Sequence, residues 1–291
     1  MKDQHFSFCA VSVIDLVKED FSSFVIGPDD LATSPYFDLA SLTKPFCLSL
    51  TALFHPELFK EKKNLWLLNH RAGLPIGGRL SKDNWRDQIQ NYSLELTATD
   101  TYSDYSALRL MLEIERQTGK SLYSLVSKYW DKEIYHWQSL PSEAYCPKTG
   151  FRAGHSIRGV VHDDNAYVLQ GELSHAGLFG TIEGVSRSIL KWSKESQKFL
   201  TLKNDLAELP KERRFVSGFD TVSDPMNTLA GAGCSRLTFG HLGFTGTSFW
   251  CDLEKQKAWV LLTNATENYW YQREGLKNLR QTLGKMIWQS T

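Results

Sequence analysis

Serine and lysine occur three positions apart twice in this chain, and this pairing can support nucleophilic catalysis. Ser41 and Lys44 form the first pair, and Ser188 and Lys191 form the second. On a helix, this spacing places the hydroxyl and the amine on one face, one turn apart, so the amine can accept the hydroxyl proton. A serine that opens a helix also lies near backbone N–H groups, which stabilise a developing oxyanion. The lysine needs a lowered pKa for this role, through burial or neighbouring cations.

The surrounding sequence favours the first pair. Ser41 follows a strand-like segment and opens an apolar helix, and Pro45 fits the first turn of that helix. Ser188 lies inside an amphipathic helix, with no preceding turn to expose it. When the four residues are considered alone, a helix-capping serine is the alternative for Ser41.

The segment Phe37-Asp38-Leu39-Ala40-Ser41-Leu42-Thr43-Lys44 resembles the nucleophile motif of the serine β-lactamase and penicillin-binding-protein superfamily. It most resembles the branch of class C β-lactamases and β-lactamase-like esterases and peptidases. Further segments resemble motifs of this branch in the same order along the chain. They are Leu67 to Pro75, Tyr102-Ser103-Asp104 with the helix behind it, the pair 159–166 and 175–179, and Gly240 to Ser248.

The resemblance implies a role for each matching residue. Ser41 attacks a carbonyl and becomes acylated, and Lys44 takes part in removing its proton. Tyr102 exchanges protons with the leaving group and the deacylating water, which requires cations such as Lys44 to lower its pKa. The N–H groups of Phe244 and Ser41 form the oxyanion hole, and Gly243 permits close approach of the backbone to a ligand.

Asp104, His241 and Leu242 depart from the family's motifs. Asp104 replaces the usual Asn, so it cannot donate a hydrogen bond when ionised; beside Lys44 it would orient the amine but raise its pKa. His241 replaces the more common Lys, and Leu242 removes a hydroxyl, which weakens binding of a substrate carboxylate. We therefore expect an ester or a different amide rather than a penicillin. A literal Lys148-Thr149-Gly150 is the alternative third motif, but no strand pattern surrounds it.

The turn-rich segment 137–180 contains most of the remaining candidate polar residues. His155, His162 and His175 do not have the spacing of a metal site, so we expect no metal and no other cofactor. A metallohydrolase that uses these histidines is a minor alternative. We expect His162, Asp163 and Asn165 to border the cleft and to support the reacting groups rather than react.

Strands near both termini and a helical middle must position these residues. Strand patterns cover 6–15, 21–27, 247–252 and 258–263, and helical patterns cover 105–118, 184–199 and the C-terminal end. We expect a discontinuous α/β lobe (1–50 and 206–291), an inserted, mainly helical lobe (51–205) and a catalytic cleft between them. The resemblance implies the same class, an α/β (α+β) β-lactamase/transpeptidase-like fold with an antiparallel sheet flanked by helices.

Composition excludes several classes of protein. The 291 residues contain 33 basic and 33 acidic side chains, and this balance argues against nucleic acid as the partner. No apolar run is long enough to span a membrane, and no signal peptide is apparent. We therefore expect a cytoplasmic protein without a membrane partner. The five scattered cysteines predict reduced, buried thiols.

Together these features predict a cofactor-independent serine hydrolase that works through an acyl-enzyme. Its expected partner is a small-molecule or short-peptide substrate with an ester or amide bond. The resemblance adds a D-amino-acid peptide from peptidoglycan as a substrate class. A non-catalytic binding or sensor module with the same fold is the alternative, and the departures at Asp104, His241 and Leu242 favour it.

Overall fold

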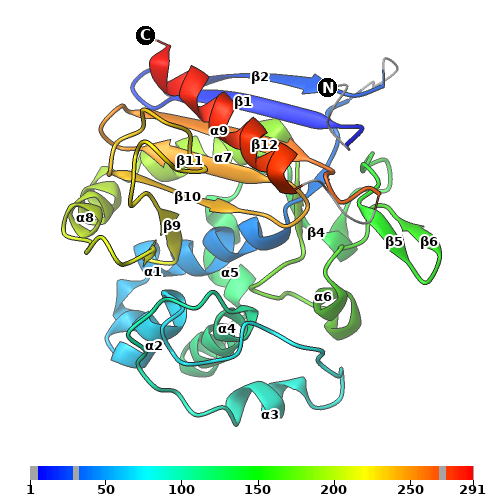
Figure 1. Ribbon diagram of the computed structural model, residues 1–291. Coiled ribbons are helices and arrows are strands. Elements are labelled where there is room, and N and C mark those ends of the chain that lie inside the picture. The colour runs from blue at the N-terminus through cyan, green and yellow to red at the C-terminus, as the bar shows by residue number, and fades with distance from the viewer. Residues whose placement is uncertain (1–5, 29–32, 269–272, 291) are drawn as a thin grey trace.

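A computed structural model describes residues 6–28, 33–268 and 273–290, and its centre is a seven-stranded antiparallel sheet built from both ends of the chain (Figure 1). The N-terminal hairpin joins the C-terminal strands because β1 pairs with β12. In the order β2-β1-β12-β11-β10-β9-β8, the strands are Asp20–Ile26, Cys9–Asp15, Lys257–Thr263, Ser248–Asp252, Thr238–Leu242, Phe219–Thr221 and Phe215–Val216. The antiparallel sheet and the four predicted strands are confirmed.

Helices cover both faces of this sheet, so its central strands are buried on both sides. α7 (Ile182–Ser193) packs against β1, β2 and β12 on one face, and α9 (Arg273–Gln289) lies across the other (Figure 1). Along β1, Ala10 contributes to the core beneath α7, whereas Val11 contributes to the core beneath α9. This alternation is the two-residue period of a strand.

Short helices and strands make up most of the rest of the described chain. A three-stranded sheet, β3-β7-β4, leads into the nucleophile segment, and β5 and β6 form a separate hairpin. The remaining strands are Phe37–Asp38 (β3), Ile134–His136 (β4), Gly150–Arg152 (β5), His155–Ile157 (β6) and Leu178–Gly180 (β7). The remaining α-helices are Leu50–Phe54 (α1), Lys62–Leu68 (α2), Trp85–Gln90 (α3), Asp104–Thr118 (α4), Leu122–Val126 (α5), Asp164–Leu169 (α6) and Ser196–Ala207 (α8).

The helix that follows the Tyr102 motif forms as predicted. Ser103 caps α4 because its side chain accepts a hydrogen bond from the N–H of Ser106 at 3.0 Å. The helix ends at Thr118, and Gly119 adopts the left-handed conformation with φ of 67°. The N-terminal cap helps to fix the position of Tyr102 and Asp104 at the start of α4.

The single helix predicted over 184–199 is wrong, because two helices occupy this range. α7 ends at Ser193 and α8 begins at Ser196, with Glu195 in a non-helical conformation between them. The sequence at the break contains neither Gly nor Pro, so its apolar periodicity continues without a visible interruption. The buried Trp192 ring packs edge-on against Phe46 near the end of α7.

The proposed division into two lobes stays a prediction. Within the range 51–205, α2 and α3 pack against α4 below the sheet, whereas α7 packs against the sheet itself (Figure 1). The five cysteines lie in the described part of the chain and are buried free thiols, as predicted. Among the described helices, none is long and apolar enough to cross a bilayer.

Candidate active site

Ser41 lies in a tight turn between β3 and the helical segment that continues into α1. The turn is a 3₁₀ helix over Ala40–Leu42, and Pro45 begins the next helical turn, Pro45–Ser49, as its position predicts. Ala40 has a φ of +47°, a conformation that is costly for a residue with a side chain. The Asp38 carboxylate accepts the Ala40 N–H at 2.8 Å. This bond holds the strained residue directly before Ser41.

A turn from the far end of the chain holds the other side of this segment. The hydroxyl of Thr245 donates to the carbonyl of Asp38 at 2.7 Å, and that of Thr247 donates to the carbonyl of Leu39 at 3.0 Å. A Cβ atom on Gly243 would lie 1.9 Å from Thr247 Oγ1 and 2.8 Å from the Leu39 carbonyl oxygen. Glycine is therefore required at 243, and the same turn brings Phe244 to the pocket beside Ser41.

Lys44 is buried directly beneath the nucleophile candidate. Its Nζ lies 3.1 Å from Ser41 Oγ, 2.6 Å from Asp104 Oδ1 and 3.2 Å from the carbonyl oxygen of His175. It also lies 4.8 Å from the centre of the Tyr102 ring. An ammonium has three N–H donors, and these three oxygens match them. The structure therefore brings together Ser41, Lys44, Tyr102 and Asp104.

Asp104 decides the charge of Lys44. Burial, the largest influence, lowers the pKa of Lys44, but the Asp104 carboxylate and Tyr102 outweigh it and raise that pKa well above its usual value. Lys44 is therefore an ammonium in the resting site. The lowered pKa that the sequence argument requires of this lysine is absent.

Tyr102 is a neutral phenol in the resting site. Burial raises its pKa, and the opposing effect of Lys44 is smaller, so the lowered pKa expected for Tyr102 is also absent. His70 fixes its position: the His70 carbonyl accepts the Thr101 N–H at 2.9 Å, and Nδ1 accepts the Ser103 N–H at 3.1 Å. The His70 and Tyr102 ring centres are 4.7 Å apart.

His241 provides no positive charge to the site. Its side chain is 2% exposed, and burial together with Lys44 lowers its pKa to about 3. Its Nδ1 lies 2.9 Å from the Leu242 carbonyl oxygen, so we assign the proton to Nδ1. Nε2 has no hydrogen-bond partner among the described residues. Lys148 does not line the pocket beside Ser41, and its Nζ lies 4.3 Å from the centre of the Phe151 ring.

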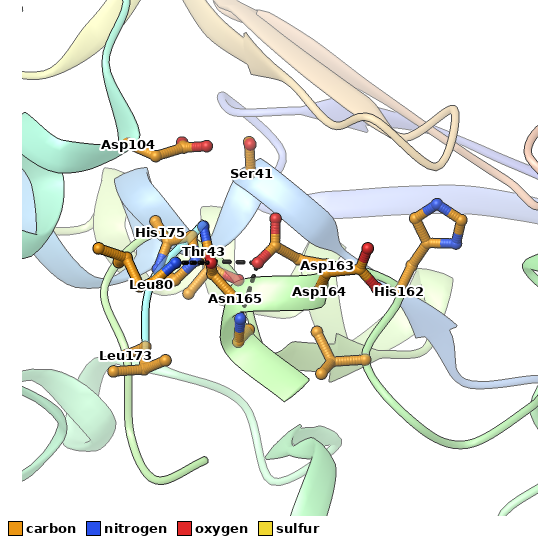
Figure 2. A network of polar contacts seen from close by, with 12 residues as sticks. Ser41, Thr43, Leu80, Asp104, His162, Asp163, Asp164, Asn165, Leu173 and His175 are labelled. Carbon is orange, nitrogen blue, oxygen red and sulfur yellow. Dashed lines mark hydrogen bonds and ion pairs between the residues drawn. The ribbon is translucent and has the colours of Figure 1, made fainter. Parts of the chain in front are cut away.

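The segment before and within α6 forms one wall of the pocket beside Ser41. Asp163 caps α6 by accepting the Ala166 N–H at 2.7 Å, and the same oxygen lies 3.1 Å from His175 Nε2 (Figure 2). Burial opposes ionisation of Asp163, but His175 and the Ala166 N–H hold its pKa well below the usual value. Asn165 donates to the Gly78 carbonyl at 2.7 Å. The segment is thus tied to the neighbouring loop.

These residues enclose a cavity of about 470 Å³, here called the Ser41 pocket, which suits a small ligand. His162, Asp163 and Asn165 border it, whereas His241 does not line it. Within residues 6–28, 33–268 and 273–290, no cluster of three or more ligand side chains could hold a metal ion. The residues that line the Ser41 pocket are Ala40, Ser41, Gly78, Arg79, Tyr102, Asp104, His162, Asp163, Asp164, Asn165, Ala176 and Phe244.

No role is predicted from the sequence for Asp38, His70 or Arg79, and His175 is considered there only as a metal-ligand candidate. The signal for Asp38 is its type: it is a charged residue between apolar neighbours in the motif, and its side chain is only 2% exposed. His70 and His175 lie within motif segments, but only the folded contacts with Ser103 and Lys44 show what they do.

Comparison with known proteins supports the fold. Residues 65–283 match a family model described as Beta-lactamase; this range contains Tyr102, Asp104 and His241 and begins after Ser41 and Lys44. The N-acetylmuramyl-L-alanine amidase of Bacillus subtilis (strain 168) is 25% identical, over 85% of this chain and 72% of that protein. A putative D-alanyl-D-alanine carboxypeptidase of Escherichia coli O157:H7 is 26% identical, over 85% of this chain and 73% of that protein.

A solved structure extends this similarity over almost the whole chain. A beta-lactamase from Mycobacterium bovis superposes with a TM-score of 0.62 at 15% identity, covering 98% of this chain and 96% of that one. At this identity the likeness shows the fold alone. The β-lactamase/transpeptidase-like fold and the resemblance to serine β-lactamases and penicillin-binding proteins are thereby confirmed. Since the family match also spans most of the sequence, the chain belongs to the beta-lactamase family.

Proposed function

We propose that this protein is a serine hydrolase that is acylated on Ser41. One observation carries the proposal: Lys44 Nζ lies within hydrogen-bond distance of Ser41 Oγ, and Ser41 lines a pocket that Tyr102 also borders. The fold of the family and the names of two relatives, an amidase and a putative carboxypeptidase, support hydrolysis in general.

Acylation would start from the small fraction of molecules in which Lys44 is neutral. The Ser41 O–H donates to the lone pair on Nζ, while the remaining two N–H groups stay with Asp104 and the His175 carbonyl. As Oγ bonds to the substrate carbonyl carbon, its proton passes to Nζ. The N–H groups of Ser41 and Phe244 are our proposed donors to the oxyanion.

Collapse of this intermediate would release the leaving group once the leaving group has received a proton. Tyr102, a neutral phenol, donates its proton to the leaving group and recovers one from Lys44, to which its hydroxyl is hydrogen-bonded. Deacylation repeats these transfers in reverse with water as the nucleophile. Each cycle then returns Ser41, Lys44 and Tyr102 to their starting protonation states.

The polar groups of the site favour esters or amides over substrates that depend on a carboxylate anchor. His241 is neutral, and Asp104 forms an ion pair with Lys44, so neither provides the positive charge or the amide donor found in relatives of this fold. We propose a small ester or amide as the substrate. A short peptide with a D-amino acid remains a candidate because of the names of the two relatives.

Hydrolysis of p-nitrophenyl acetate by the wild type and by Ser41→Ala tests the proposal. Ser188→Ala is the matched control, because Ser188 and Lys191 repeat the spacing away from the pocket. We expect turnover in the wild type and Ser188→Ala, and loss of turnover by at least about 1,000-fold in Ser41→Ala. A chromogenic cephalosporin, which carries a carboxylate, should be a poorer substrate than the ester. Turnover retained in Ser41→Ala refutes the proposal.

A binding or sensor module is the second candidate, and the ion pair between Lys44 and Asp104 favours it because it holds the proposed base in its protonated form. A fluorophosphonate probe separates the two candidates. Absence of labelling of the folded wild type, under conditions that label another serine hydrolase in the same tube, would favour the sensor.

A further inference from the structure

Asp38 is a buried carboxylate that does not line the Ser41 pocket, yet it forms hydrogen bonds with two separate parts of the site. Its Oδ1 accepts the N–H of Ala40 at 2.8 Å, directly before Ser41. Its Oδ2 accepts the N–H of His162 at 2.7 Å, directly before Asp163. Both bonds use backbone donors, so they fix the course of two chain segments rather than the rotamer of one side chain.

The two segments meet again behind the nucleophile. Asp163 contacts His175 Nε2 (Figure 2). The His175 carbonyl accepts a hydrogen bond from Lys44, which in turn contacts Ser41. Together with the two hydrogen bonds of Asp38, these contacts form a continuous chain of polar interactions that begins and ends at the Ser41 turn. A shift at Asp38 therefore changes the position of both Ser41 and Lys44.

We propose that Asp38 is a positioning residue whose carboxylate clamps the Ser41 turn to the segment before α6 and so sets the geometry of acylation. This inference rests on the function proposed above. The strained conformation of Ala40 is the reason why a clamp is needed: without an acceptor for its N–H, the turn can relax toward an ordinary backbone conformation. A displacement of about 1 Å at a reacting group costs on the order of 100-fold in rate.

The clamp requires the charged form of Asp38. A carboxylate accepts both N–H groups, whereas a protonated carboxyl keeps one good acceptor and must also place its own proton. Burial raises the pKa of Asp38 to about 7, while the His162 and Ala40 N–H groups oppose this shift. The charged or titratable side chains that act on it are Asp163, which raises its pKa, and Arg152, which lowers it; the Cys146 thiol is a further neighbour.

The test compares Asp38→Asn with the wild type by the rate at which a fluorophosphonate probe labels Ser41. The amide keeps the shape of the side chain but can accept only one of the two N–H groups and does not titrate. At pH 8.5 we expect labelling and kcat for p-nitrophenyl acetate to fall by about 10- to 100-fold, with KM changed less than about twofold. At pH 5.5 the two proteins should react at similar rates, because the wild-type carboxyl is then protonated.

Asp252→Asn is the matched control. Asp252 is also a fully buried carboxylate that accepts backbone N–H groups, from Ser235 and Glu254, but it lies on β11 away from the Ser41 pocket. We expect labelling of its folded form to stay within about twofold of the wild type at both pH values. The thermal unfolding of each variant shows that the folded form is being compared.

Three outcomes overturn the clamp: wild-type labelling by Asp38→Asn at pH 8.5, an equal loss in Asp252→Asn, or a ratio that does not change with pH. These outcomes leave the proposed function intact as long as Ser41→Ala stays inactive. Activity in Ser41→Ala would instead refute the proposed function itself, so the two failures are distinguishable.

Discussion

Among the departures from the family's motifs, Asp104 has the largest consequence for a single residue, because it contacts Lys44. At 2.6 Å it holds Lys44 in place, but it also raises the pKa of the group proposed as the base. Asp104 therefore helps to orient the Lys44 amine but makes it harder for that amine to lose its proton and act as the base. Sequence alone identified both effects and could not rank them, because the ranking depends on burial and on the distance between the two groups.

Asp104→Asn should move the pH dependence of acylation to lower pH. Removal of the carboxylate leaves burial to lower the pKa of Lys44, so a larger fraction of the amine is neutral at a given pH. In the wild type, probe labelling should still be rising at pH 10, since the pKa of Lys44 is raised. Labelling rates from pH 6 to 10 check this, and an unchanged profile in Asp104→Asn would rule out Lys44 as the base.

The raised pKa of Asp38 also predicts that the stability of the fold depends on pH. Its pKa is about 7 in the fold against 3.8 for the unperturbed group, so the unfolded chain releases this proton first. Stability should therefore fall as pH rises from about 4 to about 7, by about 4 kcal/mol from this group. Urea unfolding of the wild type and Asp38→Asn measures the difference. A gap between the two that stays constant from pH 4 to 8 contradicts it.

At the scale of elements, helix termini and short turns position most of the site residues. The start of α4 sets Tyr102 and Asp104, the start of α6 sets Asp163, and the turn after β3 sets Ser41. The sequence predicted α4 well, because its apolar residues recur at helical spacing and a glycine follows its last residue. It failed at the break between α7 and α8, because no Gly or Pro marks that break.

The α4 cap offers a prediction at this scale. Ser103→Ala removes the acceptor for the Ser106 N–H and should lower the free energy of unfolding by about 1 kcal/mol. It should also reduce kcat several-fold, because the cap lies between Tyr102 and Asp104. Ser121→Ala removes the corresponding cap of α5, a bond of 3.2 Å to the Ser124 N–H, away from the pocket.

Urea unfolding and kcat for both cap variants separate the two effects. Equal losses of stability with a loss of kcat only in Ser103→Ala would support the positioning role of α4. A reduced kcat in Ser121→Ala as well would show that stability alone explains the change.

At the scale of the whole molecule, the site depends on contacts between distant parts of the sequence. Thr245 and Thr247 bond the segment that leads to Ser41, although more than 200 residues separate them. The strands at both termini could be predicted from alternating apolar residues, and so could the sheet that joins them. The hydrogen bonds that Asp38 and His70 accept from the backbone could not be predicted, because only folding brings these groups together.

Gly243→Ala tests this long-range packing. The added methyl group would meet Thr247 Oγ1 and the Leu39 carbonyl, so the turn that carries Phe244 must move away from Ser41. We expect a loss of stability of about 1–3 kcal/mol and at least a tenfold loss of probe labelling. Gly77→Ala is the control, because a Cβ there meets nothing within 4 Å. Labelling of Gly243→Ala at the wild-type rate would show that this close approach does not position the site.

Peptide mapping by mass spectrometry, after the wild type has been stopped during turnover of a slow ester, tests the central claim most directly. The account predicts one acyl adduct on the peptide that contains Ser41, formed and lost at rates compatible with turnover and absent in Ser41→Ala. An adduct on another residue, or turnover without any adduct on Ser41, would contradict it.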